Sequence, residues 1–196
     1  MFLNKTQFKK MIKTSFNSSG IRVGNVYDGL VIAGSHWITW TESGSIPNWV
    51  KAAIMEYTGE LPTPGTMFKA KKKEPIQYEI PDQSYYNLPE YYLAARTPLI
   101  VTPVVIDNLY GQYRLMQFVV SKKIILVSDQ LFETIDLSEL EDESAPVGPC
   151  MISEESELLV WKNECSAFAF IKCKDFIGKE DEAVKLLQQI NFGEDA

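Results

Sequence analysis

The stretch that decides the fold is Leu99–Val127, LIVTPVVIDNLYGQYRLMQFVVSKKIILV. It holds three apolar runs rich in β-branched residues, which are Leu99–Ile106, Tyr113–Val120 and Ile124–Val127. The gap between the first two runs contains Asp, Asn and Gly, and the second gap is the polar Ser121-Lys122-Lys123. Runs of this length, separated by short turn-forming gaps, predict an antiparallel β meander.

Outside the meander, apolar residues recur at helical spacing in several segments. The first segment begins at Asn4, a good N-cap, and places Phe8, Met11, Ile12 and Phe16 on one stripe. Similar patterns follow later in the chain. We therefore expect four helices, at 5–16, 47–58, 129–136 and 179–190.

The remaining periodic segments read as strands. A hairpin with its turn at Asp28-Gly29 is followed by a strand at 36–41, and a last hairpin spans 157–172. Two shorter candidates lie at 66–72 and 76–80. The fold class is therefore α+β: antiparallel sheet with a few covering helices. We expect the core to include Phe8, Ile12, Trp40, Ile54, Val101, Val105, Leu115, Phe118, Ile125, Val160, Phe168 and Phe170.

The distribution of charge predicts two lobes. Residues 1–80 carry ten Lys or Arg against six Asp or Glu, whereas residues 81–196 carry nine against twenty. We expect a basic N-terminal α+β lobe at 1–80, a connector at 81–98, and an acidic C-terminal α+β lobe at 99–196. Lobes of opposite net charge would attract different partners. A variation of charge along solvated surfaces that has no function would give the same pattern.

The connector is rich in Pro and Tyr and shows little periodicity. Tyrosine suits partner surfaces because it has an apolar body and a polar tip. The rings of Tyr85, Tyr86, Tyr91 and Tyr92 are therefore candidates for a protein interface, in a homo-oligomer or with another partner. The alternative is that these rings simply cover a sheet edge.

The chain contains few of the residue types and motifs that catalytic sites use. His36 is the only histidine, which excludes a multi-histidine metal site, and we interpret it as a structural residue on a strand. Cys150, Cys165 and Cys173 lack C-x-x-C spacing, so we expect small buried side chains in a reducing compartment. Cys165 and Cys173 are expected on one strand. We predict no enzyme activity, no catalytic residue, no metal and no cofactor.

The first predicted helix is strongly basic. Lys5, Lys9 and Lys13 are spaced four apart with Lys10 beside them, and Lys71, Lys72 and Lys73 follow on an expected strand. Such lysines can contact phosphates without reading bases, so these seven are candidate nucleic-acid contacts. Lysines that merely keep a helix soluble would look the same.

An acidic segment follows the third predicted helix. Asp136, Glu139, Glu141, Asp142 and Glu143 could bind a basic cleft on a protein partner, although a solvated acidic face explains them equally well. No calcium-loop motif accompanies them.

The order of the expected elements resembles that of DNA sliding clamps, the polymerase processivity factors. Gly44-Ser45-Ile46-Pro47, leading into Trp49–Tyr57 and Gly59-Glu60-Leu61-Pro62, resembles the second helix of a bacterial clamp domain. Gly148-Pro149-Cys150 and the hairpin at Leu158–Lys172 are similar to a clamp's last strands. The resemblance implies pseudo-repeated α+β domains, basic helices that line a ring, and outer sheets that bind partners.

These observations favour a binding function. We expect a non-enzymatic binding or scaffold protein linked to nucleic-acid machinery, clamp-like and of phage or mobile-element origin. Its small, acidic, aromatic-rich and motif-poor composition resembles accessory proteins of that kind. The alternative is an acidic inhibitor that mimics nucleic acid and occupies a host nucleic-acid-binding enzyme. No apolar run is long enough for a membrane helix, and the N-terminus lacks a signal-peptide core, so we expect a cytoplasmic protein without a membrane partner.

Overall fold

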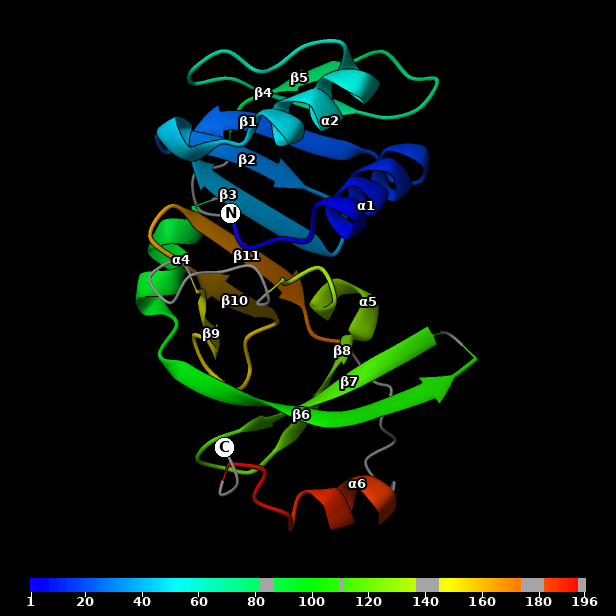
Figure 1. The fold of residues 1–196 in the computed structure, drawn as a ribbon, viewed down its shortest axis with the longest axis vertical. Helices are drawn as coiled ribbons and strands as arrows, with labels where there is room; N and C mark the ends of the chain where they lie inside the picture. The colour runs from blue at the N-terminus through cyan, green and yellow to red at the C-terminus, as the bar shows by residue number, and fades with distance from the viewer. Residues whose placement is uncertain (82–86, 110, 137–144, 174–181, 194–196) are drawn as a thin grey trace.

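A computed structural model describes residues 1–81, 87–109, 111–136, 145–173 and 182–193 (Figure 1). The helices are α1 (Lys5–Asn17), α2 (Asn48–Thr58), α4 (Leu88–Ala94), α5 (Asp129–Phe132) and α6 (Glu182–Leu187), with a 3₁₀ turn at Ser43–Ser45. The strands are β1 (Ile21–Val26), β2 (Gly29–Ala33), β3 (Trp37–Glu42), β4 (Met67–Ala70), β5 (Gln77–Glu79), β6 (Thr97–Asn108), β7 (Gly111–Phe118), β8 (Ile124–Ser128), β9 (Val147–Met151), β10 (Leu158–Lys162) and β11 (Ser166–Ile171).

The strands of the described residues form one antiparallel sheet in the order β5-β4-β1-β2-β3-β11-β10-β9-β6-β7-β8. The predicted α+β class is confirmed. The predicted meander is confirmed as well, because β6 pairs with β7 and β7 with β8. The β6–β7 hairpin is long and reaches out on one side of the molecule (Figure 1).

The two halves of the sheet share one topology. In the first half the meander β1-β2-β3 is followed by α2, and the next strand, β4, pairs with β1. In the second half the meander β6-β7-β8 is followed by α5, and the next strand, β9, pairs with β6. In the second half α4 precedes the meander, but it packs on the opposite face of the sheet from α1. The two halves therefore pair their strands in the same order.

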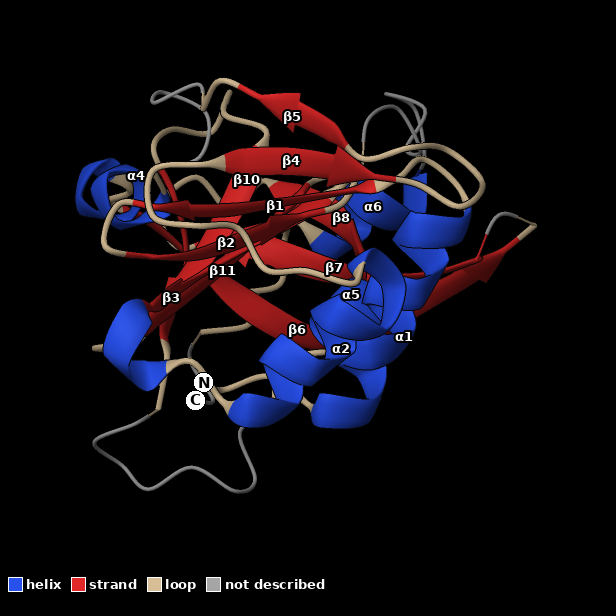
Figure 2. Ribbon diagram, turned by 90° about the horizontal axis from the view of Figure 1, so that it is seen from above, coloured by secondary structure: helices blue, strands red, loops and turns tan. Residues whose placement is uncertain are grey.

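The sheet is covered on both faces, as its side-chain alternation requires. On β11, Phe168 and Phe170 belong to the core under α1, α2 and α5, whereas Ala167 and Ala169 belong to the core under α4. Figure 2 shows α1, α2 and α5 gathered on one side of the sheet and α4 apart from them. A third, smaller apolar cluster joins the β7–β8 region to α6 through Leu187.

Two connections hold the predicted lobes together. β3 pairs with β11, so one sheet runs through both lobes. At the N-terminus, Leu3 forms a β-bridge with Ile135, and the Asn4 N–H donates to the Thr134 carbonyl oxygen at 2.8 Å. The N-terminal segment thus packs against the second half of the chain.

Most of the predicted core is buried. Ten of the twelve core residues expected from the sequence are buried, while Val101 is partly buried and Val105 is 38% exposed. Both exceptions lie on β6. Val105 is wrongly predicted because β6 extends into the long hairpin, where no segment that the structure describes buries it.

The first hairpin turns one residue earlier than the sequence suggested. Val26 pairs with Gly29, so the turn residues are Tyr27 and Asp28, both at positive φ. Gly29 is needed for a different reason: a Cβ there would lie 2.4 Å from the Trp40 Nε1 atom. That indole N–H donates to the Tyr27 carbonyl oxygen at 3.1 Å. The close packing of Trp40 therefore explains why this position requires glycine, and the turn does not.

Three other segments differ from the expectation. The connector contains the helix α4, which begins after Asn87, whose side chain accepts a hydrogen bond from the Glu90 N–H. The helix expected at 129–136 ends at Phe132. Gly148-Pro149-Cys150, which resembles part of a clamp's last strands, lies in β9. The helix expected at 179–190 covers 182–187 within the described residues.

Candidate nucleic-acid interface

Helix α1 is built so that its lysines face outward. The Asn4 side chain caps the helix by accepting from the Thr6 and Gln7 N–H groups, each at 3.0 Å. Phe8, Met11 and Ile12 are buried against the sheet. The lysines fall on the other side, and the helix contains no acidic residue. They are Lys5, Lys9, Lys10 and Lys13, of which only Lys9 is partly buried.

Helix α2 lies beside α1 on the same face of the sheet (Figure 2). The Trp49 ring packs edge-on against Phe8, with centroids 5.8 Å apart, and the Tyr57 ring packs against Phe16 at 5.2 Å. Helix α2 also carries Lys51, which is partly buried and was not among the sequence candidates.

The β4–β5 turn brings three more lysines to the end of α1. The Lys72 N–H donates to the Phe16 carbonyl oxygen at 3.0 Å. Lys71 forms an ion pair of 2.7 Å with Glu74, while Lys72 and Lys73 are exposed. The structure therefore joins two groups of lysines that lie more than fifty residues apart in the sequence.

We call this set of lysines the basic surface. Among the residues the structure describes, Lys71 is its only member in an ion pair. The acidic side chain on the same elements is Glu74 in the turn. The members of the basic surface are Lys5, Lys9, Lys10, Lys13, Lys71, Lys72 and Lys73.

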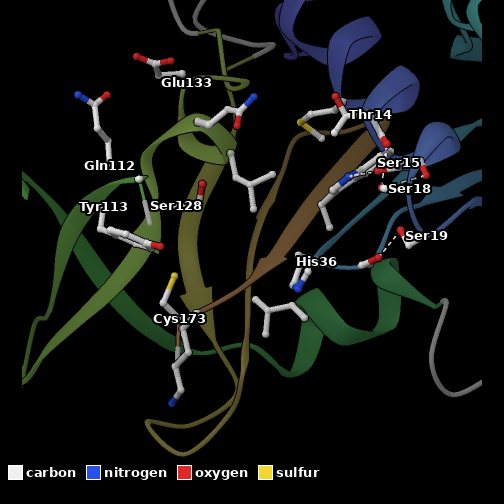
Figure 3. A pocket seen from close by; sticks show the side chains of 18 of the residues that line it. Thr14, Ser15, Ser18, Ser19, His36, Gln112, Tyr113, Ser128, Glu133 and Cys173 are labelled. Carbon is white, nitrogen blue, oxygen red and sulfur yellow. Dashed lines mark hydrogen bonds between the residues drawn. The ribbon is translucent and has the colours of Figure 1, made fainter. Parts of the chain in front are cut away.

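A cleft of about 1140 Å³ opens beside the basic surface (Figure 3). One wall comes from α1 and the β2–β3 turn, and the opposite wall from β7, the end of β8 and the segment around α5. The first wall is rich in hydroxyl groups and shares Lys10 with the basic surface. We call this cavity the hydroxyl cleft; its first wall includes Lys10, Thr14, Ser15, Ser18, Ser35 and His36.

Hydrogen bonds order the hydroxyl wall. The Trp37 indole N–H donates to Ser15 Oγ at 3.2 Å, and the Ser18 hydroxyl donates to the Thr14 carbonyl oxygen at 2.8 Å. The Ser35 hydroxyl donates to Ser19 Oγ (Figure 3). His36 precedes β3 and is exposed, so the expectation of a structural histidine on a strand was wrong.

The floor of the cleft is the chain that leaves β11. The Ile171 N–H donates to the His36 carbonyl oxygen at 3.0 Å, and the Cys173 N–H donates to the Leu126 carbonyl oxygen at 2.8 Å. Burial raises the pKa of the Cys173 thiol, partly offset by a hydrogen bond from the Ser128 backbone. Burial and the neighbouring Lys123 lower the pKa of Lys172.

The cysteines differ from the expectation in two respects. All three are partly buried, not fully buried. Cys165 precedes β11 and Cys173 follows it, so they do not share a strand. No group of three or more His, Cys, Asp or Glu side chains within the described ranges is arranged to hold a metal ion.

The connector tyrosines that the structure describes pack onto the sheet. The Tyr91 hydroxyl donates to the Leu158 carbonyl oxygen at 2.9 Å, and both Tyr91 and Tyr92 pack against the core under α4. The Lys162 Nζ atom lies 5.5 Å from the centroid of the Tyr92 ring. Tyr85 and Tyr86 lie outside the described residues.

The predicted acidic surface is described only at its start. The Asp136 N–H donates to the Phe2 carbonyl oxygen at 2.9 Å, which ties this residue to the N-terminus. Glu139, Glu141, Asp142 and Glu143 lie outside the described residues. No helix in the described part of the chain is long and apolar enough to cross a membrane.

No protein-family model matches this chain, and no curated protein matches it significantly. Two solved structures are similar to it: the β subunit of DNA polymerase from Streptococcus pyogenes, with a TM-score of 0.34, and the β chain of DNA polymerase III from Streptococcus pneumoniae, with a TM-score of 0.33. Each is 10% identical, and each alignment covers 90% of this chain and 65% of the other. The chain thus spans slightly less than two thirds of the length of these proteins. The predicted resemblance to sliding clamps is found here as a weak likeness of topology.

Proposed function

We propose that this chain is a non-enzymatic binding protein that holds a nucleic acid by its sugar–phosphate backbone and serves as a scaffold for nucleic-acid machinery. One observation carries the proposal. Lysines from α1 and the β4–β5 turn come together at the end of α1, and one of the seven is neutralised by an ion pair within the described residues. Unpaired lysines that converge from separate segments are suited to a polyanion.

The placement of these lysines does not serve the stability of α1. The N-terminus of a helix carries partial positive charge, which favours acidic residues in the first turn. Here the first turn holds no acid and begins with Lys5. The like charges of Lys5, Lys9 and Lys13, spaced four apart, also repel one another weakly. A bound polyanion would offset both costs.

Such a surface would bind without reading sequence. Lysine side chains contact phosphates as point charges, and phosphate contacts carry no sequence information directly. We therefore expect similar affinity for nucleic acids of unrelated sequence, and a steep dependence on salt.

We also propose a protein partner or self-association as part of the scaffold role. The outer edge of β5 has no strand beside it within the described residues, and Tyr78 on that strand is 70% exposed. An open edge can pair with another chain. Sedimentation velocity over a range of concentrations tests self-association: a rising sedimentation coefficient is expected, and a constant monomer value would contradict it.

Charge reversal tests the nucleic-acid contact. The double variant Lys9→Glu/Lys13→Glu should weaken binding to duplexes of unrelated sequence by roughly tenfold or more, and to the same degree for each. The matched control is Lys123→Glu/Lys185→Glu, which changes the net charge equally at exposed residues away from the basic surface. If both variants lose the same affinity, the effect is one of net charge and the proposed surface is wrong.

A further inference from the structure

We infer that the hydroxyl cleft receives a single strand of nucleic acid, whose backbone continues onto the basic surface. The inference rests on the proposed function and deepens it, since it specifies which form of nucleic acid is bound and where its bases go. Its starting point is that Lys10 and α1 belong to both the basic surface and the cleft wall.

The α1 wall is suited to the phosphate backbone. Lys10 supplies an ammonium group, and Thr14 and Ser15 supply hydroxyl groups from the same helix face. Because Ser15 Oγ accepts from the Trp37 indole, its own O–H can be donated to a ligand. Hydroxyl and lysine side chains are common partners of phosphate and sugar oxygens.

The opposite wall is suited to bases and unsuited to phosphates. It carries the carboxylate of Glu133, which repels phosphate, beside the amides of Gln112 and Gln130. Carboxylate and amide groups hydrogen-bond to the edges of bases. A strand in the cleft would therefore keep its phosphates on the α1 wall and turn its bases toward β7 and α5.

Each wall also carries an aromatic side chain. His36 is exposed on the first wall, and Tyr113 lines the second with its hydroxyl directed into the cleft (Figure 3). Tyrosine and histidine rings are common stacking partners of unpaired bases. Bases in a duplex are already stacked on one another, so this contact favours a single strand.

The size of the floor agrees with one strand. The first wall attaches to the floor at Ile171 and the second at Cys173. Two residues of extended chain span about 7 Å, whereas the major groove of a duplex alone is about 12 Å wide. At its floor the cleft therefore matches one strand more closely than a duplex.

Fluorescence anisotropy with two labelled probes tests the inference: an oligothymidylate of about 16 nucleotides and a mixed-sequence duplex of the same length. His36→Ala/Tyr113→Leu should weaken single-strand binding at least about fivefold and leave duplex binding within about twofold. Leucine keeps the packing of the Tyr113 side chain against the third apolar cluster. Leu93→Ala, at an exposed residue of α4 outside the cleft, is the control and should change neither affinity.

The outcomes separate this inference from the proposed function. If Lys9→Glu/Lys13→Glu weakens both probes but His36→Ala/Tyr113→Leu leaves the oligothymidylate affinity unchanged, the cleft assignment is wrong and the basic surface stands. If Lys9→Glu/Lys13→Glu changes neither affinity, both the proposed function and the cleft assignment are wrong.

If circular dichroism shows that His36→Ala/Tyr113→Leu is unfolded, His36→Ala alone, at its exposed site, replaces it. At least a twofold loss of single-strand affinity is then expected, and no loss would contradict the inference. Oligouridylate in the same titration distinguishes RNA from DNA, and loss with either supports the assignment.

Discussion

The backbone N–H of Lys72 donates a 3.0 Å hydrogen bond to the carbonyl oxygen of Phe16, in the last turn of α1. This bond satisfies one of the carbonyl groups that a helix leaves unpaired at its C-terminus. It also fixes the lysine-rich β4–β5 turn beside the lysines of α1. The short segment between α1 and β1 lies at this contact. The continuity of the basic surface therefore depends on it.

Gly20 is the residue on which this junction depends. It adopts φ +90, and a Cβ there would lie 3.1 Å from the Ala70 carbonyl oxygen and 3.2 Å from the Lys71 Cβ atom. Gly20→Ala should lower the free energy of unfolding by about 1–2 kcal/mol, because an L side chain is strained at positive φ. Urea denaturation measures the change. Gly44→Ala is the control, since a Cβ at Gly44 meets open space; an equal loss at both sites would contradict the assignment of Gly20.

Tyr91 is expected to serve the fold, because its ring packs under α4 and its hydroxyl donates to the Leu158 carbonyl oxygen. Tyr91→Phe should lower the free energy of unfolding by about 0.5–1.5 kcal/mol, the usual net value of one hydrogen bond. Leu93→Ala, at a residue 65% exposed, should change it by less than about 0.5 kcal/mol. Thermal denaturation at several protein concentrations checks this. A Tyr91→Phe effect that appears only where the protein self-associates would assign the ring to an interface instead.

Burial raises the pKa of the Cys150 and Cys173 thiols above the ordinary value of 9.0. At pH 8 the folded protein then holds less thiolate at these residues than the unfolded chain, so alkylation by iodoacetamide should be slower in buffer than in urea. The two protonated thiols contribute to the free energy of unfolding in full below pH 9. This contribution is lost as the pH rises through the pKa values that the thiols have in the folded protein. Mass spectrometry of each cysteine peptide measures the rates. Equal rates with and without urea would refute the burial of these thiols.

The local sequence predicted the helices and strands well, but it predicted the turns and connections between them poorly. The meander β6-β7-β8 was predictable because its runs are long, β-branched and separated by turn formers. The turn at Tyr27 and Asp28 was displaced by one residue because Gly29 serves the packing of Trp40, a contact that pattern cannot reveal. Helix α4 did carry a local signal: Asn87 followed by Glu90 is a capping pattern, and Pro89 suits the first helical turn.

The candidate interface was predictable only in part. The α1 lysines could be found from their spacing, and Lys71, Lys72 and Lys73 from their clustering. The proximity of the second group to α1 depends on pairing between distant segments. The hydroxyl cleft depends on the same long-range contacts, since its walls come from both halves of the sheet.

The salt dependence of duplex binding tests the central claim most directly. Each lysine–phosphate contact contributes about −0.9 to the slope of log K against log salt concentration, so the basic surface predicts a slope between roughly −3 and −6. The Lys9→Glu/Lys13→Glu variant should make that slope shallower by about 2, while Lys123→Glu/Lys185→Glu leaves it unchanged. A wild-type slope near zero, or the same slope in the wild type and the Lys9→Glu/Lys13→Glu variant, would contradict a nucleic-acid contact through this surface.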